Sequence, residues 1–236
     1  MSFIKNAAVV SALVAVSAAQ AGTLKGIYTT AFNKQAQFET TFAGHLDQGT
    51  VQWNGARTGG TDTTIANAFV AYCVELGEFI NPGNEVTQNV YPLLGSTTNA
   101  GGLSGPVNFN ATRTKNLETL WGTFFTSVGD KNTSAAFQMA VWEIAFDDDL
   151  SLTNSSGHMF GTDRDIATAG IQLDPVSQQA QSWLSQIASG AATQRQSLAL
   201  LSGQGVQDLI TPVPEPATLV AIGLGIAAIA TRKKRN

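Results

Sequence analysis

The pattern of apolar and polar positions divides the 236-residue chain into a β-rich first half and a helical second half. Four segments of the first half have the composition of strands, with Gly and Asn turns between them: 24–32, 37–42, 50–53 and 65–76. Two stretches rich in Gly, Ser, Thr and Asn predict loops, at 95–110 and 151–161.

Three helices are expected after Asn110. Residues 114–128 carry apolar side chains every three to four positions, and residues 134–146 form a second helical segment. Asp174 followed by Pro175 is typical of a helix N-cap with proline at the first helical position, and this third helix runs through Ile187. The chain therefore predicts an α+β fold, with a sandwich- or barrel-like first half and a helical second half.

The first 21 residues have the three parts of a secretory signal peptide. Lys5 supplies a positive charge, residues 7–18 form an apolar run, and Ala19-Gln20-Ala21 matches an A-x-A cleavage site. We therefore expect cleavage before Gly22 and export of the chain. A permanent N-terminal anchor is the alternative, although the apolar run is short for a membrane span.

The C-terminal tail combines an apolar segment with a basic end. Residues 217–231 carry no charge, and as a helix they extend about 22 Å, which is shorter than a hydrocarbon core of roughly 30 Å. The basic residues that follow would stay on the cytoplasmic side: Arg232, Lys233, Lys234 and Arg235. The tail predicts a single transmembrane helix, with the preceding domain outside the inner membrane.

Pro214, Glu215 and Pro216 immediately precede this segment. The Pro-Glu-Pro motif, the short apolar helix and the basic cluster together resemble the PEP-CTERM sorting tail of exported proteins in Gram-negative bacteria that build exopolysaccharide. An ordinary tail anchor with a chance Pro-Glu-Pro is the alternative.

The resemblance to the sorting tail implies partners and a location. The implied partners are the export machinery, the membrane and exosortase, a membrane protease-transpeptidase that acts near the motif. The implied route leads through a membrane-anchored intermediate to the cell surface or the extracellular matrix of a biofilm. The expected organisation is a signal peptide at 1–21, an exported surface domain at 22–211 and a sorting tail at 212–236.

Charge and cysteine content exclude several classes of function. The formal net charge is −4, and the acidic residues concentrate between the basic ends, which argues against a nucleic-acid partner. One cysteine rules out an intrachain disulfide, and one cysteine with two histidines argues against a structural zinc site. The chain has no GxSxG, P-loop, GxGxxG or HExxH motif, so we expect no enzyme and no cofactor, and the sequence assigns no metal ligands.

The single cysteine, Cys73, lies in a segment with strand composition. By alternation, Phe69, Ala71 and Cys73 share one face of this strand, and Tyr72 lies on the other. Because both faces are largely apolar, the strand is expected to be covered on both sides. A small buried side chain without chemistry is one interpretation of Cys73.

Gln138 lies in the middle of the apolar stripe of the second predicted helix. At 100° per residue, Val141, Trp142 and Ala145 fall close to it. A buried amide without partners costs on the order of 1–3 kcal/mol, so it needs hydrogen bonds or has been changed chemically. A Gln bonded to the backbone of a neighbouring strand is therefore the alternative to a reactive one.

Tyr-Cys-Val-Glu at 72–75 and Ala-Phe-Gln-Met-Ala-Val-Trp-Glu at 136–143 together resemble the thioester domains of bacterial surface proteins. In those domains the Cys sulfur is joined to the Gln side-chain carbonyl with loss of ammonia. The resemblance therefore implies Cys73 as the sulfur donor and Gln138 as the acyl donor. Four aromatic residues are the candidates that would keep water from the bond: Phe69, Tyr72, Phe137 and Trp142.

This resemblance implies a covalent adhesin that captures a nucleophile on a surface, polymer or protein. Such a protein reacts at most once, so it is not an enzyme in the usual sense. The alternative is a non-covalent structural or carbohydrate-binding component of an exopolysaccharide matrix, in which Cys73 and Gln138 are ordinary core residues.

Acidic residues flank both motifs. Glu75 and Glu143 are expected to be solvated surface carboxylates, with assistance to proton transfer as the alternative. Asp147, Asp148 and Asp149 follow the helix, and their spacing fits no EF-hand loop. We expect a solvated helix end there, and a calcium site stays open.

Overall fold

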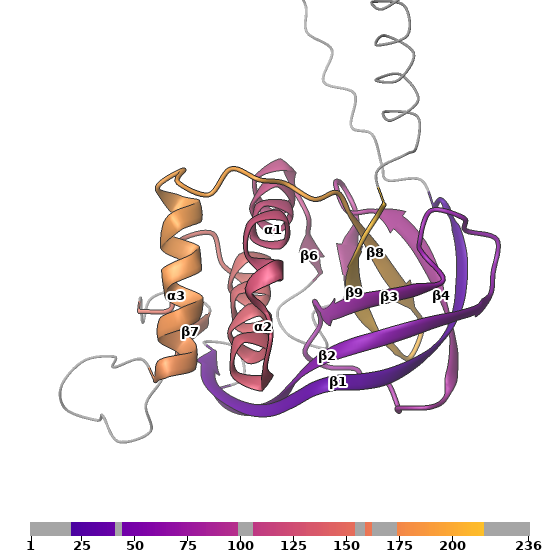
Figure 1. Ribbon diagram of the computed structural model, residues 1–236, viewed down its shortest axis with the longest axis horizontal. Coiled ribbons are helices and arrows are strands. Elements are labelled where there is room, and N and C mark those ends of the chain that lie inside the picture. Colours follow the sequence, from indigo (N-terminus) through magenta and orange to yellow (C-terminus); the bar gives the residue numbers. More distant parts are fainter. Residues whose placement is uncertain (1–19, 41–43, 99–105, 154–158, 162–173, 215–236) are drawn as a thin grey trace, which may run out of the picture.

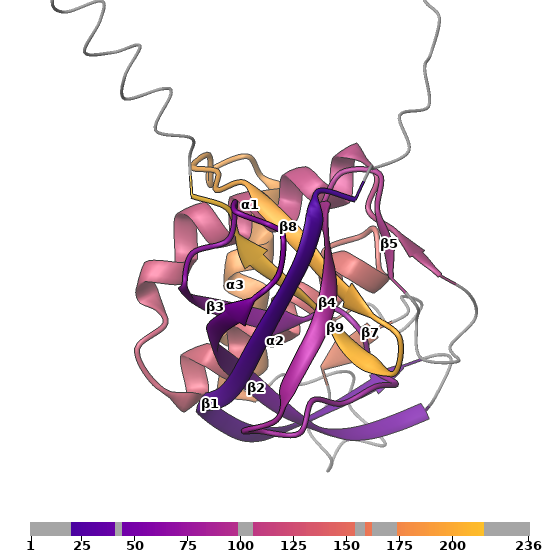
Figure 2. The same ribbon diagram turned by 90° about the vertical axis from the view of Figure 1, so that its right-hand side faces the viewer.

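The computed structural model describes residues 20–40, 44–98, 106–153, 159–161 and 174–214 (Figure 1). Six strands close into an antiparallel barrel, and the helices pack side by side next to it (Figures 1 and 2). Around the barrel the order is β1, β2, β3, β9, β8 and β4, and β4 pairs with β1. These strands are β1 (Gly22–Thr40), β2 (Gly44–Gly59), β3 (Ala68–Cys73), β4 (Glu85–Pro92), β8 (Leu198–Gly203) and β9 (Val206–Pro212).

The hairpin of β1 and β2 is longer than the barrel. Pairing between the two strands continues to Thr40 and Gly44, whereas β1 pairs with β4 only from Gly22 to Ile27. Register shifts at 25–26 and 30–32 bend β1, as β-bulges do. The far half of the hairpin therefore leaves the barrel and runs alongside α2, where the short strand β7 (Met159–Gly161) pairs with its end (Figure 1).

The helices are α1 (Ala111–Phe124), the 3₁₀ turn η1 (Phe125–Ser127), α2 (Lys131–Phe146) and α3 (Pro175–Ala188). Each α-helix begins at a side-chain cap that satisfies otherwise unpaired N–H groups. Asn110 caps α1, Asp130 and Thr133 form a capping box on α2, and Asp174 caps α3. The predicted N-cap at Asp174 is confirmed.

Aromatic rings fill the space between the barrel and the helices. Tyr72 of β3 lies 4.8 Å from Phe137 of α2, measured between ring centroids, and 5.8 Å from Trp121 of α1. Phe137 also contacts Trp183 of α3 at 6.2 Å. Such pairs add about 0.5–1.5 kcal/mol each beyond the burial of their area. The helices are therefore fixed on β3, the strand that carries the cysteine.

A second aromatic group, centred on Tyr28, Trp53 and Phe69, packs against the other face of β3. The Tyr28 ring meets Trp53 at 6.3 Å and Phe69 at 5.7 Å, both edge to face. Gly55 of β2 makes room for this packing, because a Cβ there would overlap the Phe69 ring. The predicted covering of β3 on both faces is confirmed.

The β-rich first half and the helices of the second half are confirmed, but the second half is not wholly helical. β8 and β9 follow the helices and complete the barrel, and the sequence pattern did not predict them. The predicted loop at 95–110 contains two short strands, β5 (Thr97–Thr98) and β6 (Val107–Asn108), which pair with each other. Of the two proposed architectures, the barrel is the one observed.

Both predicted targeting segments fall largely outside the described residues. Residues 1–19 of the signal peptide and the predicted transmembrane helix at 217–231 are not among them. Within the described ranges, no helix has the length and apolar character needed to cross a bilayer.

Candidate functional site

Cys73 ends β3 at a place where the pairing between β3 and β2 has already ended. Trp53 of β2 pairs with Ala71, two residues before Cys73, and β2 makes no further pair along β3. On the other side, β9 continues and pairs Leu209 with Cys73. The edge of Cys73 that β2 would have covered is therefore open to another partner.

That partner is the side chain of Gln138 from α2. The backbone N–H of Cys73 donates to Gln138 Oε1 at 3.0 Å, and Gln138 Nε2 donates to the Cys73 carbonyl oxygen at 2.7 Å. The carboxamide thus pairs with both backbone groups of one residue, as a neighbouring strand would. Gln138 has no exposed surface. The two residues, 65 positions apart in the chain, are in direct contact.

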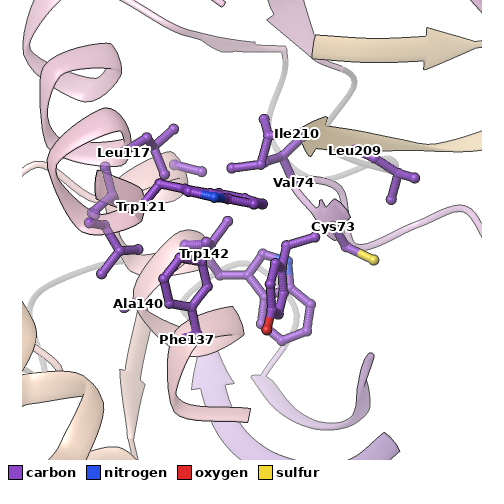
Figure 3. Packing of buried hydrophobic residues seen from close by; sticks show 14 of the residues in the cluster. Cys73, Val74, Leu117, Trp121, Phe137, Ala140, Trp142, Leu209 and Ile210 are labelled. Atoms are coloured by element: carbon purple, nitrogen blue, oxygen red, sulfur yellow. The ribbon is translucent and has the colours of Figure 1, made fainter. Parts of the chain in front are cut away.

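The sulfur of Cys73 points toward the barrel side of β3. Trp53 Nε1 donates to Cys73 Sγ at 3.4 Å. Figure 3 shows Cys73 at the edge of the cluster, with Phe137, Trp121 and the helices on the other side. Burial raises the pKa of the Cys73 thiol to about 12, and the charge of Glu75 adds to this, whereas the Trp53 bond lowers it. The sulfur is therefore a neutral thiol at neutral pH.

The four predicted shield residues are all buried, with exposed fractions between 0% and 7%. They lie on both sides of the Cys73 strand. Phe69 packs with Tyr28 on the barrel side, whereas Tyr72 and Phe137 contact each other on the helix side. Trp142 is buried on α2, one turn after Gln138. The four rings are thus buried on the elements that carry Cys73 and Gln138.

The prediction that Glu75 and Glu143 are solvated is wrong. Their exposed fractions are 1% and 0%. Glu75 lies directly after β3 and Glu143 lies on α2, and other parts of the fold bury both, which one strand or one helical wheel cannot reveal. Burial raises the pKa of Glu75 to about 7, with a further increase from the charge of Asp208, although the Asp208 N–H bond lowers it.

Glu75 is the titratable group whose charge acts on the Cys73 thiol. One of its oxygens, Oε2, accepts the N–H of Asp208 at 3.1 Å. Its other oxygen, Oε1, is buried and has no hydrogen-bond partner within the part of the chain that the structure describes. A buried carboxylate oxygen without a hydrogen-bond partner can accept a proton.

Sequence reasoning missed Trp53 as part of the site. Trp53 was placed on a strand, but its contact with the sulfur depends on the register between β2 and β3. No local signal in one sequence gives that register.

The predicted sorting residues lie at and beyond the end of the described chain. Pro214 is exposed after β9, and Glu215, Pro216 and the basic residues 232–235 lie outside the described residues. The PEP-CTERM protein-sorting motif matches residues 212–235 of this chain. No curated protein and no solved structure matches the chain.

The match at 212–235 indicates how the protein is exported and sorted. The chain carries an exosortase sorting signal, so it is an exported surface protein that is processed by exosortase, its partner in sorting. Export and a membrane-anchored sorting step precede its arrival at the cell surface or in the extracellular space. The match begins at the last residue of β9, so the barrel ends where the sorting tail starts.

Proposed function

We propose that this exported protein forms an internal thioester between Cys73 and Gln138 and uses it to attach covalently to a nucleophile on a surface polymer or protein. The observation that carries the proposal is the paired hydrogen bonding of the Gln138 carboxamide with the backbone of Cys73. A primary amide is a poor electrophile, so it reacts with a thiol only when the two groups are held together.

The hydrogen bonds of Gln138 favour attack on its carbonyl carbon. The Cys73 N–H donates to Oε1, the oxygen that gains negative charge as sulfur adds to Cδ. A fixed donor at such an oxygen stabilises the transition state of acyl transfer. In the balanced step, the Sγ–Cδ bond forms, the Cδ–Nε2 bond breaks, and the thiol proton leaves with the amine as ammonia.

Proton transfer in this step needs a group near the thiol, because Cys73 is neutral at physiological pH. Glu75 is the group that we propose for this role. Its charge acts on the thiol, its pKa is close to 7, and its Oε1 has no other partner among the described residues. A carboxyl group with this pKa can accept and return a proton near neutral pH.

Exclusion of water supports the survival of such a bond. An activated acyl group hydrolyses if water reaches it, and the aromatic side chains around the contact leave almost no exposed area. An incoming amine or hydroxyl must therefore displace part of this covering. After it attacks Cδ, the thiol of Cys73 is released and Gln138 carries the new amide or ester.

The second candidate function is a non-covalent structural component of an extracellular matrix. It is favoured by the hydrogen bonds themselves, since Gln138 meets the backbone of Cys73 and the sulfur accepts from Trp53. In that case, Gln138 replaces the missing pairs of β2 and holds α2 on the barrel without any reaction.

Intact-mass measurement of the purified protein separates the two functions. The thioester predicts a mass lower by one ammonia than the sequence requires and no thiol that can be titrated. Methylamine should then free the thiol and give a mass one methylene above that of the unreacted chain. Cys73→Ala serves as the control and should have its full calculated mass before and after methylamine. A full mass in the unmodified protein, with a thiol that titrates after unfolding, would refute the thioester.

A further inference from the structure

Three carboxylates gather where α2 ends. One oxygen each from Glu143, Asp147 and Asp149 can be chosen so that all three lie within 4.8 Å of one another. Two oxygens bound to one Ca²⁺ ion lie no further apart than about twice the Ca²⁺–oxygen distance of about 2.4 Å, so the spacing of these three oxygens meets the condition for sharing one ion. The sequence pattern pointed to a solvated helix end here, but Asp147 is only 8% exposed and Glu143 is fully buried.

Glu143 is the side chain whose hydrogen bonding indicates a bound ligand. Its Oε1 accepts the N–H of Ser151 at 2.8 Å, whereas its Oε2 is buried and has no hydrogen-bond partner among the residues described. Burial raises the pKa of Glu143 to about 9. The charges of Asp147 and Asp149 and a side-chain hydrogen bond with Asp149 raise this pKa further, whereas the bond from the Ser151 N–H lowers it. A buried carboxylate beside two others is costly unless a cation or a proton joins them.

The turn after α2 wraps around these carboxylates. Asp149 Oδ1 accepts the N–H of Ser151 at 2.9 Å, and Leu150 adopts a positive φ of 57°. Gln181 of α3 holds the turn from outside, since its Oε1 accepts the Leu152 N–H at 2.7 Å and its Nε2 donates to the Leu150 carbonyl. Glu143 in the last turn of α2 and the two aspartates that follow this helix are therefore held between α2 and α3.

Asp148 differs from its neighbours. Its side chain is 73% exposed and pairs with Arg113 of α1 at 3.0 Å. The positive charge of Arg113 is thus directed to the one acid of the run that lies outside the cluster. Asp149 is exposed, so an ion can enter the cluster from solvent. The C-terminal end of a helix also favours a cation.

We propose that Glu143, Asp147 and Asp149 bind one Ca²⁺ ion at the end of α2. All three donors are carboxylate oxygens, which hard divalent cations prefer, and Ca²⁺ accepts the irregular geometry of a loop more readily than Mg²⁺. The ion would join the end of α2 to the turn that α3 supports. It would therefore stabilise the helix that carries Gln138, whether or not a thioester forms.

Calcium titration of the full-length protein, purified in detergent and freed of metal with EDTA, tests this site. Calorimetry should show one Ca²⁺ bound, and the melting midpoint should rise in about 5 mM Ca²⁺, which exceeds the dissociation constants of roughly 10⁻⁴–10⁻³ M of extracellular calcium modules. Asp149→Asn, at an exposed position, should weaken binding at least about tenfold. Glu143→Gln, which keeps the size of the buried side chain, should abolish the rise.

Asp148→Asn is the matched control, because it removes a charge from the same run but not from the cluster. It should bind Ca²⁺ as the wild type does. The proposal is overturned if Ca²⁺ gives no heat and no change of melting midpoint in the wild type. It is also overturned if Asp149→Asn and Asp148→Asn weaken binding equally, since diffuse surface charge then explains the effect.

Discussion

Replacement of Cys73 by Ala measures how much the proposed thioester contributes to stability. The bond would close a loop between two residues 65 positions apart. By the chain-entropy relation for cross-links, a loop of this length stabilises the folded state by about 4 kcal/mol. Without a cross-link, Cys73→Ala leaves a small cavity and removes the acceptor of the Trp53 N–H, which costs about 1–2 kcal/mol.

Methylamine separates the cross-link from these local effects, because it opens the thioester and leaves the cysteine in place. A domain of this size loses roughly 2–4 °C of melting midpoint per kcal/mol. Methylamine should therefore lower the midpoint of the wild-type protein by roughly 8–16 °C. Differential scanning calorimetry of the full-length protein before and after treatment gives both midpoints.

The same treatment of Cys73→Ala is the control and should leave its midpoint unchanged. If methylamine changes neither the mass nor the melting of the wild-type protein, Cys73 and Gln138 are not joined. If it lowers both midpoints equally, the reagent acts elsewhere, and the cross-link argument fails as well.

Three further changes test the packing and the charges of the site. Gln138→Met should destabilise the fold more than Cys73→Ala by about 1–3 kcal/mol, measured by thermal melting, because it leaves both backbone groups of Cys73 buried without partners; equal losses would contradict this. Folding raises the pKa of Glu75 from 4.5 to about 7, so its favourable contribution is complete below pH 4.5 and is lost as the pH rises to 7. The melting temperature of Glu75→Gln should therefore rise relative to that of the wild type between pH 5 and pH 7.5. A constant difference would show that Glu75 does not titrate there. Gly55→Ala should lower stability by about 1–3 kcal/mol, because the new Cβ overlaps the Phe69 ring, and a midpoint equal to that of the wild type would show that the ring can move.

Elements with strong local signals could be predicted from the sequence. The helix placed at 134–146 is observed at Lys131–Phe146, and the cap at Asp174 starts α3 as expected. The signals for this helix and this cap depend on side chains that lie only a few residues apart in the chain. β8 and β9 were not predicted, because each is a short apolar run. They pair with each other, but their other partners lie on strands more than 100 positions earlier.

The site was predicted in part for the same reason. The need of Gln138 for hydrogen bonds follows from its place on an apolar helix face, and the structure gives these bonds to the backbone of Cys73. The burial of Glu143 could not be found in this way. Its side of α2 is polar in the sequence, yet the turn at 147–152 and α3 cover it.

The position of β9 has a consequence for the order of events during folding. β3 gains its pairing with β9 only when residues 209 and 210 are present, and β9 ends at Pro212, directly before the sorting tail. Contacts that join distant parts of a chain form slowly. The barrel therefore cannot close until residues 209 and 210 are available, so β3 gains its last strand partner only when nearly all of the sequence before the sorting tail has been made.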